Sequence, residues 1–183
     1  MAKALFLDRD GIINIDHGYV HKKENFDFVE GIFDLCRIAV KNNYKLIVIT
    51  NQAGIARGYY SIDDFEVLTE WMKEQFILRS VPINSVYFCP HHPTKGDNCY
   101  KMACNCRKPE PGMIFRAQNE QKIDLKQSIF IGDKITDIQA AQNAGIDNRI
   151  LVSSLYEDDL NISAYRTNSV MGAKTLVKQF AKS

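Results

Sequence analysis

Short apolar runs alternate along this chain with segments in which apolar residues recur at helical spacing, and this alternation limits the folds that it can adopt. The apolar runs predict strands at residues 4–7, 46–49, 86–88, 128–131 and 150–152. The helical spacing predicts helices at residues 32–40, from an N-cap at 61 to 76, and at 113–119, 135–144 and 171–182. Strands that alternate with helices of about ten residues form βαβ units. We therefore predict an α/β fold, a Rossmann-like parallel sheet flanked by helices.

Length and charge restrict the chain further. Its 183 residues fit one domain, and a 45% apolar and 25% charged composition is ordinary for a globular protein. The 23 Lys and Arg residues nearly balance the 22 Asp and Glu residues, so the net charge of +1 gives no attraction to nucleic acid or to an anionic membrane. We expect a single domain at 1–183 that takes a small-molecule substrate and has neither nucleic-acid nor membrane partners.

The apolar runs also bear on location. None approaches the roughly 18 residues that a membrane span needs. Charged residues at positions 8–10 interrupt the first apolar stretch, which therefore does not read as a secretory signal. We expect a cytoplasmic protein and, because no long apolar surface helix is evident, a monomer.

Acidic residues follow two of the predicted strands. Asp8 and Asp10 come directly after the first, and Asp133 follows the strand at 128–131, with Asp137 a turn further on. In parallel sheets ligands bind beyond the carboxyl ends of the strands. Carboxylates that converge from two strand ends call for a cation, and oxygen ligands favour Mg²⁺. The alternative for either motif alone is an acidic turn that ends a strand.

Groups suited to phosphate binding accompany these carboxylates. Thr50 and Asn51 follow the predicted strand at 46–49 and supply a hydroxyl and an amide. Arg107 and Lys108 form a cationic pair later in the chain. Beside an acidic Mg²⁺ site, such a pair suggests a phosphorylated substrate. Alone, the pair would be read as two solvated side chains on a loop.

A loop at about 89–108 carries soft metal ligands. Cys89, His91, Cys104 and Cys106 form two short motifs, C-x-H and C-x-C, whose three thiolates and one imidazole fit a closed tetrahedral Zn²⁺ site. Cys99 and His92 are alternative ligands within the same loop. A site with four protein ligands leaves no open position, so we expect the zinc to be structural. Cys36 lies on an apolar helix face and is expected in the core.

These motifs together resemble those of the haloacid dehalogenase-like phosphohydrolases. The resemblance rests on D-x-D-G at 8–11, Thr50-Asn51, Lys108 and Gly132-Asp133-Lys134 with Asp137. The segments at 16–20, 54–58, 89–93 and 104–109 are similar to a subgroup that carries a zinc loop and no separate cap domain. The resemblance implies a Mg²⁺-dependent phosphatase acting on the 7-phosphate of a heptose bisphosphate in lipopolysaccharide-core precursor synthesis. Histidinol-phosphate phosphatases carry the same loop and are the alternative.

The resemblance also implies catalytic roles. Asp8 would attack phosphorus to form an aspartyl-phosphate, and Asp10 would protonate the leaving oxygen and then activate water. Thr50 and Lys108 would stabilise the transferring phosphoryl group. Mg²⁺ would be held by the Asp8 carboxylate, the Asp10 main-chain carbonyl and Asp133.

The remaining roles concern the substrate. Arg107 would recognise its distal phosphate, and Lys134 and Asp137 would orient the acidic groups. The expected substrate-binding residues are Asp16, His17, Gly18, Tyr19, Asn51, Gln52, Ala53, Arg57, Arg107 and Lys134. Two other classes stay open: a zinc-knuckle binding protein without activity, which the intact Asp8 and Asp10 argue against, and a phosphotransferase that passes the phosphoryl group to an alcohol.

Overall fold

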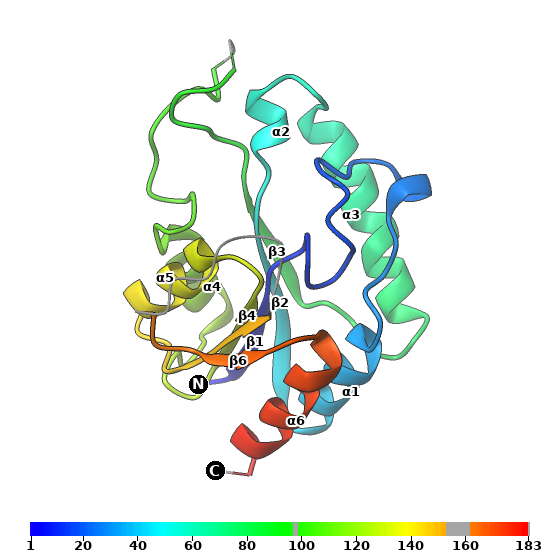
Figure 1. Cartoon of the computed structure of the whole chain (residues 1–183), viewed down its shortest axis with the longest axis vertical. Helices are drawn as coiled ribbons and strands as arrows, with labels where there is room; N and C mark the ends of the chain where they lie inside the picture. Colours follow the sequence, from blue (N-terminus) through cyan, green and yellow to red (C-terminus); the bar gives the residue numbers. More distant parts are fainter. Residues whose placement is uncertain (97–98, 153–161, 183) are drawn as a thin grey trace.

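A computed structural model describes residues 1–96, 99–152 and 162–182 (Figure 1). The strands are β1 (Lys3–Leu7), β2 (Tyr44–Asn51), β3 (Ser85–Cys89), β4 (Ile129–Gly132), β5 (Asn148–Val152) and β6 (Tyr165–Thr167). The helices are α1 (Ile32–Lys41), α2 (Ala53–Ala56), α3 (Ile62–Ile77), α4 (Gly112–Gln121), α5 (Ile135–Asn143) and α6 (Val170–Phe180), with a 3₁₀ turn at Lys23–Asn25. The six strands form one sheet in the order β3-β2-β1-β4-β5-β6, and every pair is parallel.

This architecture confirms the predicted α/β fold. All five strands and five helices expected from the sequence are present, with ends that shift by a few residues. Three short elements were not expected: the 3₁₀ turn, the four-residue α2 and the three-residue β6. Each is too short for apolar periodicity to be visible in the sequence.

Helices cover both faces of the sheet because the strand side chains alternate between them. On β1, Leu5 and Leu7 belong to the core formed with α1, α3 and α6, whereas Ala4 and Phe6 belong to the core formed with α4 and α5. Figure 1 shows the two groups of helices on opposite sides of the strands. Cys36 is fully buried in the first core, as expected.

The strand order places a crevice at the end of β1. From β1 the chain proceeds outward through β2 to β3, then returns to the other side of β1 to form β4. Such a reversal opens a space beyond the carboxyl ends of the central strands. At this edge, Leu7 of β1 is in register with Val48 of β2 and Ile131 of β4. Asn51 of β2 is in register with Cys89 of β3. The motifs at residues 8, 50, 89 and 133 therefore converge on one edge of the sheet.

In the described part of the chain, no helix combines the length and the apolar character that crossing a bilayer requires.

Candidate active site and metal clusters

Three buried carboxylates meet beyond the sheet. Asp8 follows β1, Asp133 follows β4, and Asp137 lies in the first turn of α5. One carboxylate oxygen from each lies within 4.8 Å of the others, and all three residues are buried. We call these residues the acidic cluster. Oxygen ligands at this spacing fit a small hard cation such as Mg²⁺.

Lys108 brings a cation into this cluster. Its Nζ lies 2.9 Å from Asp8 Oδ1 and 2.7 Å from Asp137 Oδ1, and it donates to the Ile49 carbonyl at 2.9 Å. Burial opposes the charge, yet the neighbouring carboxylates of Asp137 and Asp8 raise the pKa of Lys108 above its ordinary value. The three donors of the ammonium group are thus all engaged, and the side chain is a fixed point charge.

The carboxylates themselves resist joint ionisation. Burial, followed by the charges of Asp8 and Asp137, raises the pKa of Asp133 to about 8. Burial and then Asp137 also raise the pKa of Asp8. One ammonium group therefore does not neutralise the cluster, and a divalent cation would complete its charge balance.

The local backbone holds the carboxylates in place. Asp137 Oδ2 accepts the main-chain N–H groups of Asp133 at 3.2 Å and Lys134 at 3.1 Å, which ties the start of α5 to the end of β4. Gly11 has a φ of 92°, and a Cβ atom there would collide with the Asp133 carboxylate. A glycine after Asp10 therefore lets the turn that follows β1 approach Asp133 closely.

The Asp10 side chain lies outside the acidic cluster. Arg9 binds it through both carboxylate oxygens, Nε to Oδ2 at 3.1 Å and Nη2 to Oδ1 at 2.9 Å. Asn14 donates to Oδ1 at 3.1 Å and Gln52 to Oδ2 at 3.2 Å. This placement separates the expected acid/base carboxylate from the expected nucleophile. A metal contact through the Asp10 main-chain carbonyl remains a prediction.

Arg9 was missed by the sequence analysis. Its side chain is buried between the rings of Phe26 and Phe65, 5.9 and 5.8 Å from the guanidinium carbon. Its Nη2 also donates to the Val20 carbonyl at 2.6 Å. The same guanidinium thus fixes Asp10 and the end of the 15–20 loop. An arginine between two aspartates gave no sequence signal for this role, because both rings come from distant segments.

A buried network connects Asp10 to Thr50. Gln52 Nε2 donates to Asp10 Oδ2 and, at 2.8 Å, to Thr50 Oγ1, and the Tyr60 hydroxyl donates to Gln52 Oε1 at 2.6 Å. An ionised carboxylate accepts only, so the amide nitrogen of Gln52 faces Asp10 in that form. Because Thr50 Oγ1 accepts from Gln52, the hydroxyl proton of Thr50 points elsewhere. It is therefore free to form a hydrogen bond to an oxygen of a bound phosphoryl group. Tyr60 was not identified from the sequence.

Asn51 ties the end of β2 to Lys108. Its Nδ2 donates to the Lys108 carbonyl at 3.2 Å, and its Oδ1 accepts the Lys108 main-chain N–H at 3.0 Å. This reciprocal pair fixes the backbone from which the lysine reaches the acidic cluster.

A cavity of about 320 Å³ opens beside these groups. Eleven residues singled out in the sequence line it: Asp10, Asp16, Gly18, Tyr19, Asn51, Gln52, Ala53, Arg57, Arg107, Lys108 and Lys134. Tyr60 and Thr136, which the sequence analysis did not select, also line it, as does His92, which was named only as an alternative zinc ligand. His17 is not brought to the cavity, since its Nε2 pairs with Asp27 Oδ2 at 2.8 Å on the surface. The volume falls at the lower end of the range for small-ligand sites.

The cations of this cavity differ in how they are paired. Lys134 Nζ lies 3.2 Å from Asp16 Oδ2, and although burial opposes its charge, Asp8, Asp133 and other carboxylates raise the pKa of Lys134. Among residues 1–96, 99–152 and 162–182, no carboxylate lies within 4.0 Å of the guanidinium of Arg57 or Arg107. The cavity therefore has positive charge available for an anion.

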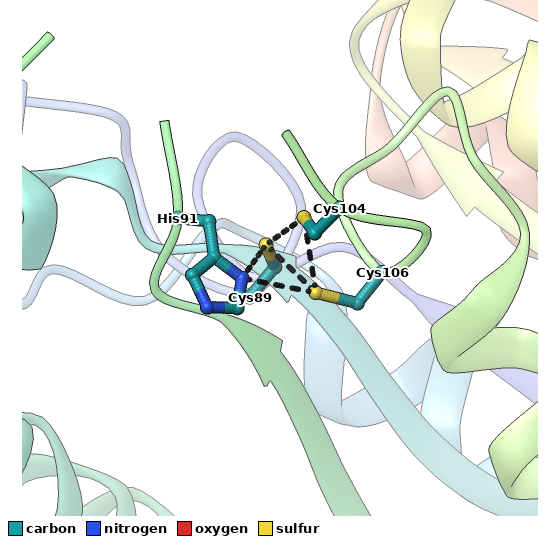
Figure 2. A group of neighbouring side chains, drawn as sticks. All are labelled: Cys89, His91, Cys104 and Cys106. Carbon is teal, nitrogen blue, oxygen red and sulfur yellow. Dashed lines mark hydrogen bonds between the residues drawn. The ribbon is translucent and has the colours of Figure 1, made fainter. Parts of the chain in front are cut away.

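Cys89, His91, Cys104 and Cys106 form a second cluster, which we call the cysteine cluster (Figure 2). The thiols are free, and the Sγ atoms lie 3.1 Å (Cys89 to Cys106), 3.3 Å (Cys104 to Cys106) and 3.5 Å (Cys89 to Cys104) apart. His91 Nδ1 lies 3.3 Å from Cys106 Sγ. Figure 2 shows the four side chains pointing toward one another.

The donor set of the cysteine cluster fits zinc. A tetrahedral ion with Zn–S bonds of about 2.3 Å would space its sulfur ligands by roughly 3.8 Å, close to the separations found. The alternative ligands do not join the group: Cys99 is exposed, and His92 Nδ1 accepts the backbone N–H groups of Thr94 and Lys95. Burial raises the pKa of the Cys89 thiol, so a bound metal would have to displace its proton.

Comparison with known proteins places this arrangement in a family. A family model described as HAD-hydrolase-like matches residues 105–168. A D-glycero-beta-D-manno-heptose-1,7-bisphosphate 7-phosphatase from Haemophilus influenzae is 43% identical over 185 residues, covering 100% of both chains. The corresponding enzyme from Yersinia pestis is 48% identical over 149 residues, 81% of this chain and 79% of the relative. An alpha-heptose counterpart from Burkholderia mallei is 52% identical over 150 residues, 82% of this chain and 79% of the relative.

Solved structures give the same result. A putative HAD-like phosphatase from Mesorhizobium loti superimposes with a TM-score of 0.84 at 30% identity, covering 98% of this chain and 87% of the other. A D,D-heptose 1,7-bisphosphate phosphatase from B. bronchiseptica, complexed with magnesium and phosphate, superimposes with a TM-score of 0.83 at 25% identity, covering 97% and 98%. With the fold, the acidic cluster and a relative matched over its whole length, this chain belongs to the haloacid dehalogenase-like hydrolases, in the family of the D-glycero-D-manno-heptose-1,7-bisphosphate 7-phosphatases.

Proposed function

We propose that this chain hydrolyses the 7-phosphate of D-glycero-D-manno-heptose 1,7-bisphosphate, giving heptose 1-phosphate and inorganic phosphate. One observation carries the proposal. Lys108, which contacts the buried Asp8 carboxylate, lines a cavity whose guanidinium groups have no carboxylate partner in the described chain. A candidate nucleophile bound to Lys108, next to a cavity that holds further positive charge, suits a substrate that carries two phosphates. The names of the relatives support the choice of sugar.

The reaction would proceed in two steps on Asp8. In the first, a carboxylate oxygen of Asp8 bonds to phosphorus and the bond from phosphorus to the sugar O7 breaks, while Asp10 gives its proton to the leaving oxygen. In the second, Asp10 takes a proton from water, the water oxygen attacks phosphorus, and the aspartyl–phosphate bond breaks. Asp8 is thereby regenerated and phosphate is released.

Neighbouring groups prepare these steps. The Arg9 fork and the Gln52 amide hold the Asp10 carboxylate in one orientation. The Thr50 hydroxyl, whose oxygen already accepts from Gln52, and the Lys108 ammonium would stabilise charge on the transferring phosphoryl group. These contacts fix the donors before the substrate binds, which lowers the reorganisation required in the transition state.

Two metal ions belong to the proposal. Asp8, Asp133 and the Asp10 main-chain carbonyl would hold Mg²⁺, which when bound would neutralise phosphoryl charge. Asp137 would orient this site through its hydrogen bonds to the Asp133 and Lys134 backbone. The cysteine cluster would hold a structural Zn²⁺ and thereby fix Arg107, the residue after Cys106.

Arg107 is proposed to recognise the distal phosphate of the substrate. Its Nη1 donates to the His91 carbonyl at 3.2 Å, which leaves the rest of the guanidinium fork for a ligand in the cavity. We further propose that the enzyme acts in the cytoplasm as a monomer, in the synthesis of lipopolysaccharide-core precursors.

A substrate comparison tests this function. Phosphate release should be measured with Mg²⁺ for both anomers of heptose 1,7-bisphosphate, histidinol phosphate and p-nitrophenyl phosphate. We expect kcat/KM to be highest for one of the bisphosphate anomers. A preference for histidinol phosphate would favour the alternative pathway, and transfer to an added alcohol in place of water would identify a phosphotransferase. If no ester releases phosphate, the remaining hypothesis is the zinc-knuckle binding protein without enzymatic activity.

A further inference from the structure

Arg57 has an unusual environment for a cavity-lining arginine. It follows α2 as the C-cap residue, and its guanidinium carbon lies 5.7 Å from the centroid of the Tyr19 ring. Its Nε is buried and has no hydrogen-bond partner in the described chain. A buried donor left without a partner is costly. Because the Arg57 side chain also lines the cavity, this cost points to a ligand whose binding brings an acceptor to the guanidinium.

His92 provides a second donor in the same cavity. Its Nδ1 accepts the backbone N–H groups of Thr94 at 3.2 Å and Lys95 at 3.0 Å. A ring nitrogen that accepts cannot carry a proton, so the ring proton lies on Nε2. The turn that follows His92 thus fixes the tautomer and leaves an N–H edge for a ligand.

The loop between β3 and α4 brings these groups together. Gly96 of this loop has a φ of 96° and packs so closely on the end of α2 that a Cβ would collide with the Ala56 carbonyl. Arg107, from the other end of the loop, is tied to the His91 carbonyl. The end of α2 and the two ends of this loop therefore place Arg57, His92 and Arg107 around one cavity.

We propose that Arg57 and the Nε2–H of His92 join Arg107 in a subsite for the second phosphate of the substrate, and that the Tyr19 ring positions Arg57. This inference rests on the proposed function, which assigns the reacting phosphate to Thr50 and Lys108. A phosphate dianion offers several acceptors, and an arginine fork binds two of them at once. Tyr19 holds the guanidinium from one face, so its edge stays available.

The test compares two substrates that differ only in this phosphate, heptose 1,7-bisphosphate and heptose 7-phosphate. The readout is the ratio of their kcat/KM values. Arg57→Met should lower this ratio by about 30-fold, the loss of one charge-assisted contact. Arg57→Lys keeps the charge but not the fork, and should lower it by about fivefold. The matched control is Arg37→Met, an exposed arginine on α1, which should leave the ratio unchanged.

Two further variants locate the subsite. His92→Phe should lower the ratio by several-fold, and Tyr19→Leu should do so mainly through KM for the bisphosphate. In Arg57→Met/Arg107→Met, the combined loss should differ from the product of the single losses, because both residues contact one phosphate.

The outcomes separate the two hypotheses. If wild type does not prefer the bisphosphate, the proposed substrate is wrong. If wild type does prefer the bisphosphate, but Arg57→Met and Arg57→Lys have the wild-type ratio of kcat/KM values, the subsite is wrong. This includes the case in which a variant loses activity equally on both substrates. Circular dichroism of each variant shows whether a loss of activity comes from unfolding. If Arg57→Met is unfolded, the kcat/KM ratios of Arg57→Lys and Tyr19→Leu decide whether the subsite exists.

Discussion

The acidic cluster and the cysteine cluster both gather groups that repel one another when ionised, but they are built differently. The acidic cluster sits at the ends of β1 and β4 and the start of α5, and Lys108 supplies a cation from within the protein. The cysteine cluster begins at the end of β3 and continues in a loop. In the part of the chain that the structure describes, it consists of three thiols and one imidazole.

This difference separates two uses of a metal. The sheet and Lys108 hold the acidic cluster together without an added ion, so the proposed Mg²⁺ would serve the chemistry there. As far as the structure describes the chain, the cysteine cluster includes no lysine or arginine side chain, so the proposed Zn²⁺ would hold it together. Variants in the acidic cluster should therefore change activity with little effect on the loop. Variants in the cysteine cluster should destabilise the loop first and affect activity only through the loop residues that line the cavity.

Asp8→Asn should have the largest effect. An amide does not attack phosphorus, so kcat should fall by at least about 10⁴-fold. The fold should survive, because the substitution removes one of three mutually repelling carboxylates. Phosphate release checks the fall in kcat, thermal unfolding checks the fold, and metal analysis by mass spectrometry should show that the variant keeps any zinc that wild type holds. Activity near wild type would eliminate the covalent mechanism, and loss of zinc would show that the two clusters are coupled.

Lys108→Met should make the acidic cluster as dependent on metal as the cysteine cluster. Removing a buried cation leaves its carboxylate partners uncompensated, which costs about 3–5 kcal/mol of unfolding free energy. Urea unfolding without Mg²⁺ measures this loss, and added Mg²⁺ should restore more stability to the variant than to wild type. Lys73→Met removes a lysine that pairs with Glu70 on the surface and should change stability by less than about 1 kcal/mol. Equal losses in both variants would contradict the role assigned to Lys108.

The sequence predicted the strand-end part of the site and much of the fold for the same reason. Strands and long helices have apolar periodicity, and Asp8, Asp133 and Thr50 lie at strand ends, where the topology brings them together. The zinc ligands carry a short-range spacing that is visible without a structure. These features depend on local pattern and on one rule about parallel sheets.

The residues that were missed depend on tertiary contacts. Tyr60 reaches Gln52 across a turn, and Arg9 is enclosed by rings from two other segments. His17 was also expected at the substrate, but the structure places its side chain beside Asp27 on the surface and not along the cavity. Asp16 and Gly18, on either side of it, do line the cavity. Loop side chains have no fixed period, so the sequence does not give their direction.

Cys104→Ser should affect the loop and spare the sheet. Wild type should contain about one Zn²⁺ per chain, and the variant should lose it with about 2–3 kcal/mol of stability. Far-ultraviolet circular dichroism should stay close to wild type. Cys99→Ser is the matched control, because this exposed thiol in the same loop lies outside the cysteine cluster. A zinc-free wild type with an ordered loop and full activity would overturn the structural role of the metal.

Asp64→Asn sharpens the comparison with an aspartate that needs no cation. Asp64 and Asp137 both occupy the third position of a helix, in α3 and α5, but Asp64 is exposed and forms a reciprocal capping box with Ser61. The Ser61 backbone N–H and then its hydroxyl donate to this carboxylate and hold the pKa of Asp64 below its ordinary 3.8.

A carboxyl group whose pKa is lower in the folded state stabilises the protein above its unfolded pKa, and this contribution disappears as the pH falls through the folded pKa. At pH 7, Asp64→Asn should therefore lower Tm by roughly 2 °C, the scale of a helix cap in a chain of this size. The difference from wild type should shrink steadily below pH 4, and Mg²⁺ should not alter it. A Tm difference that persists unchanged into strong acid would mean that the Asp64 charge does not contribute to stability. A Tm difference that changes with Mg²⁺ would mean that this exposed carboxylate depends on metal, contrary to its placement outside the acidic cluster.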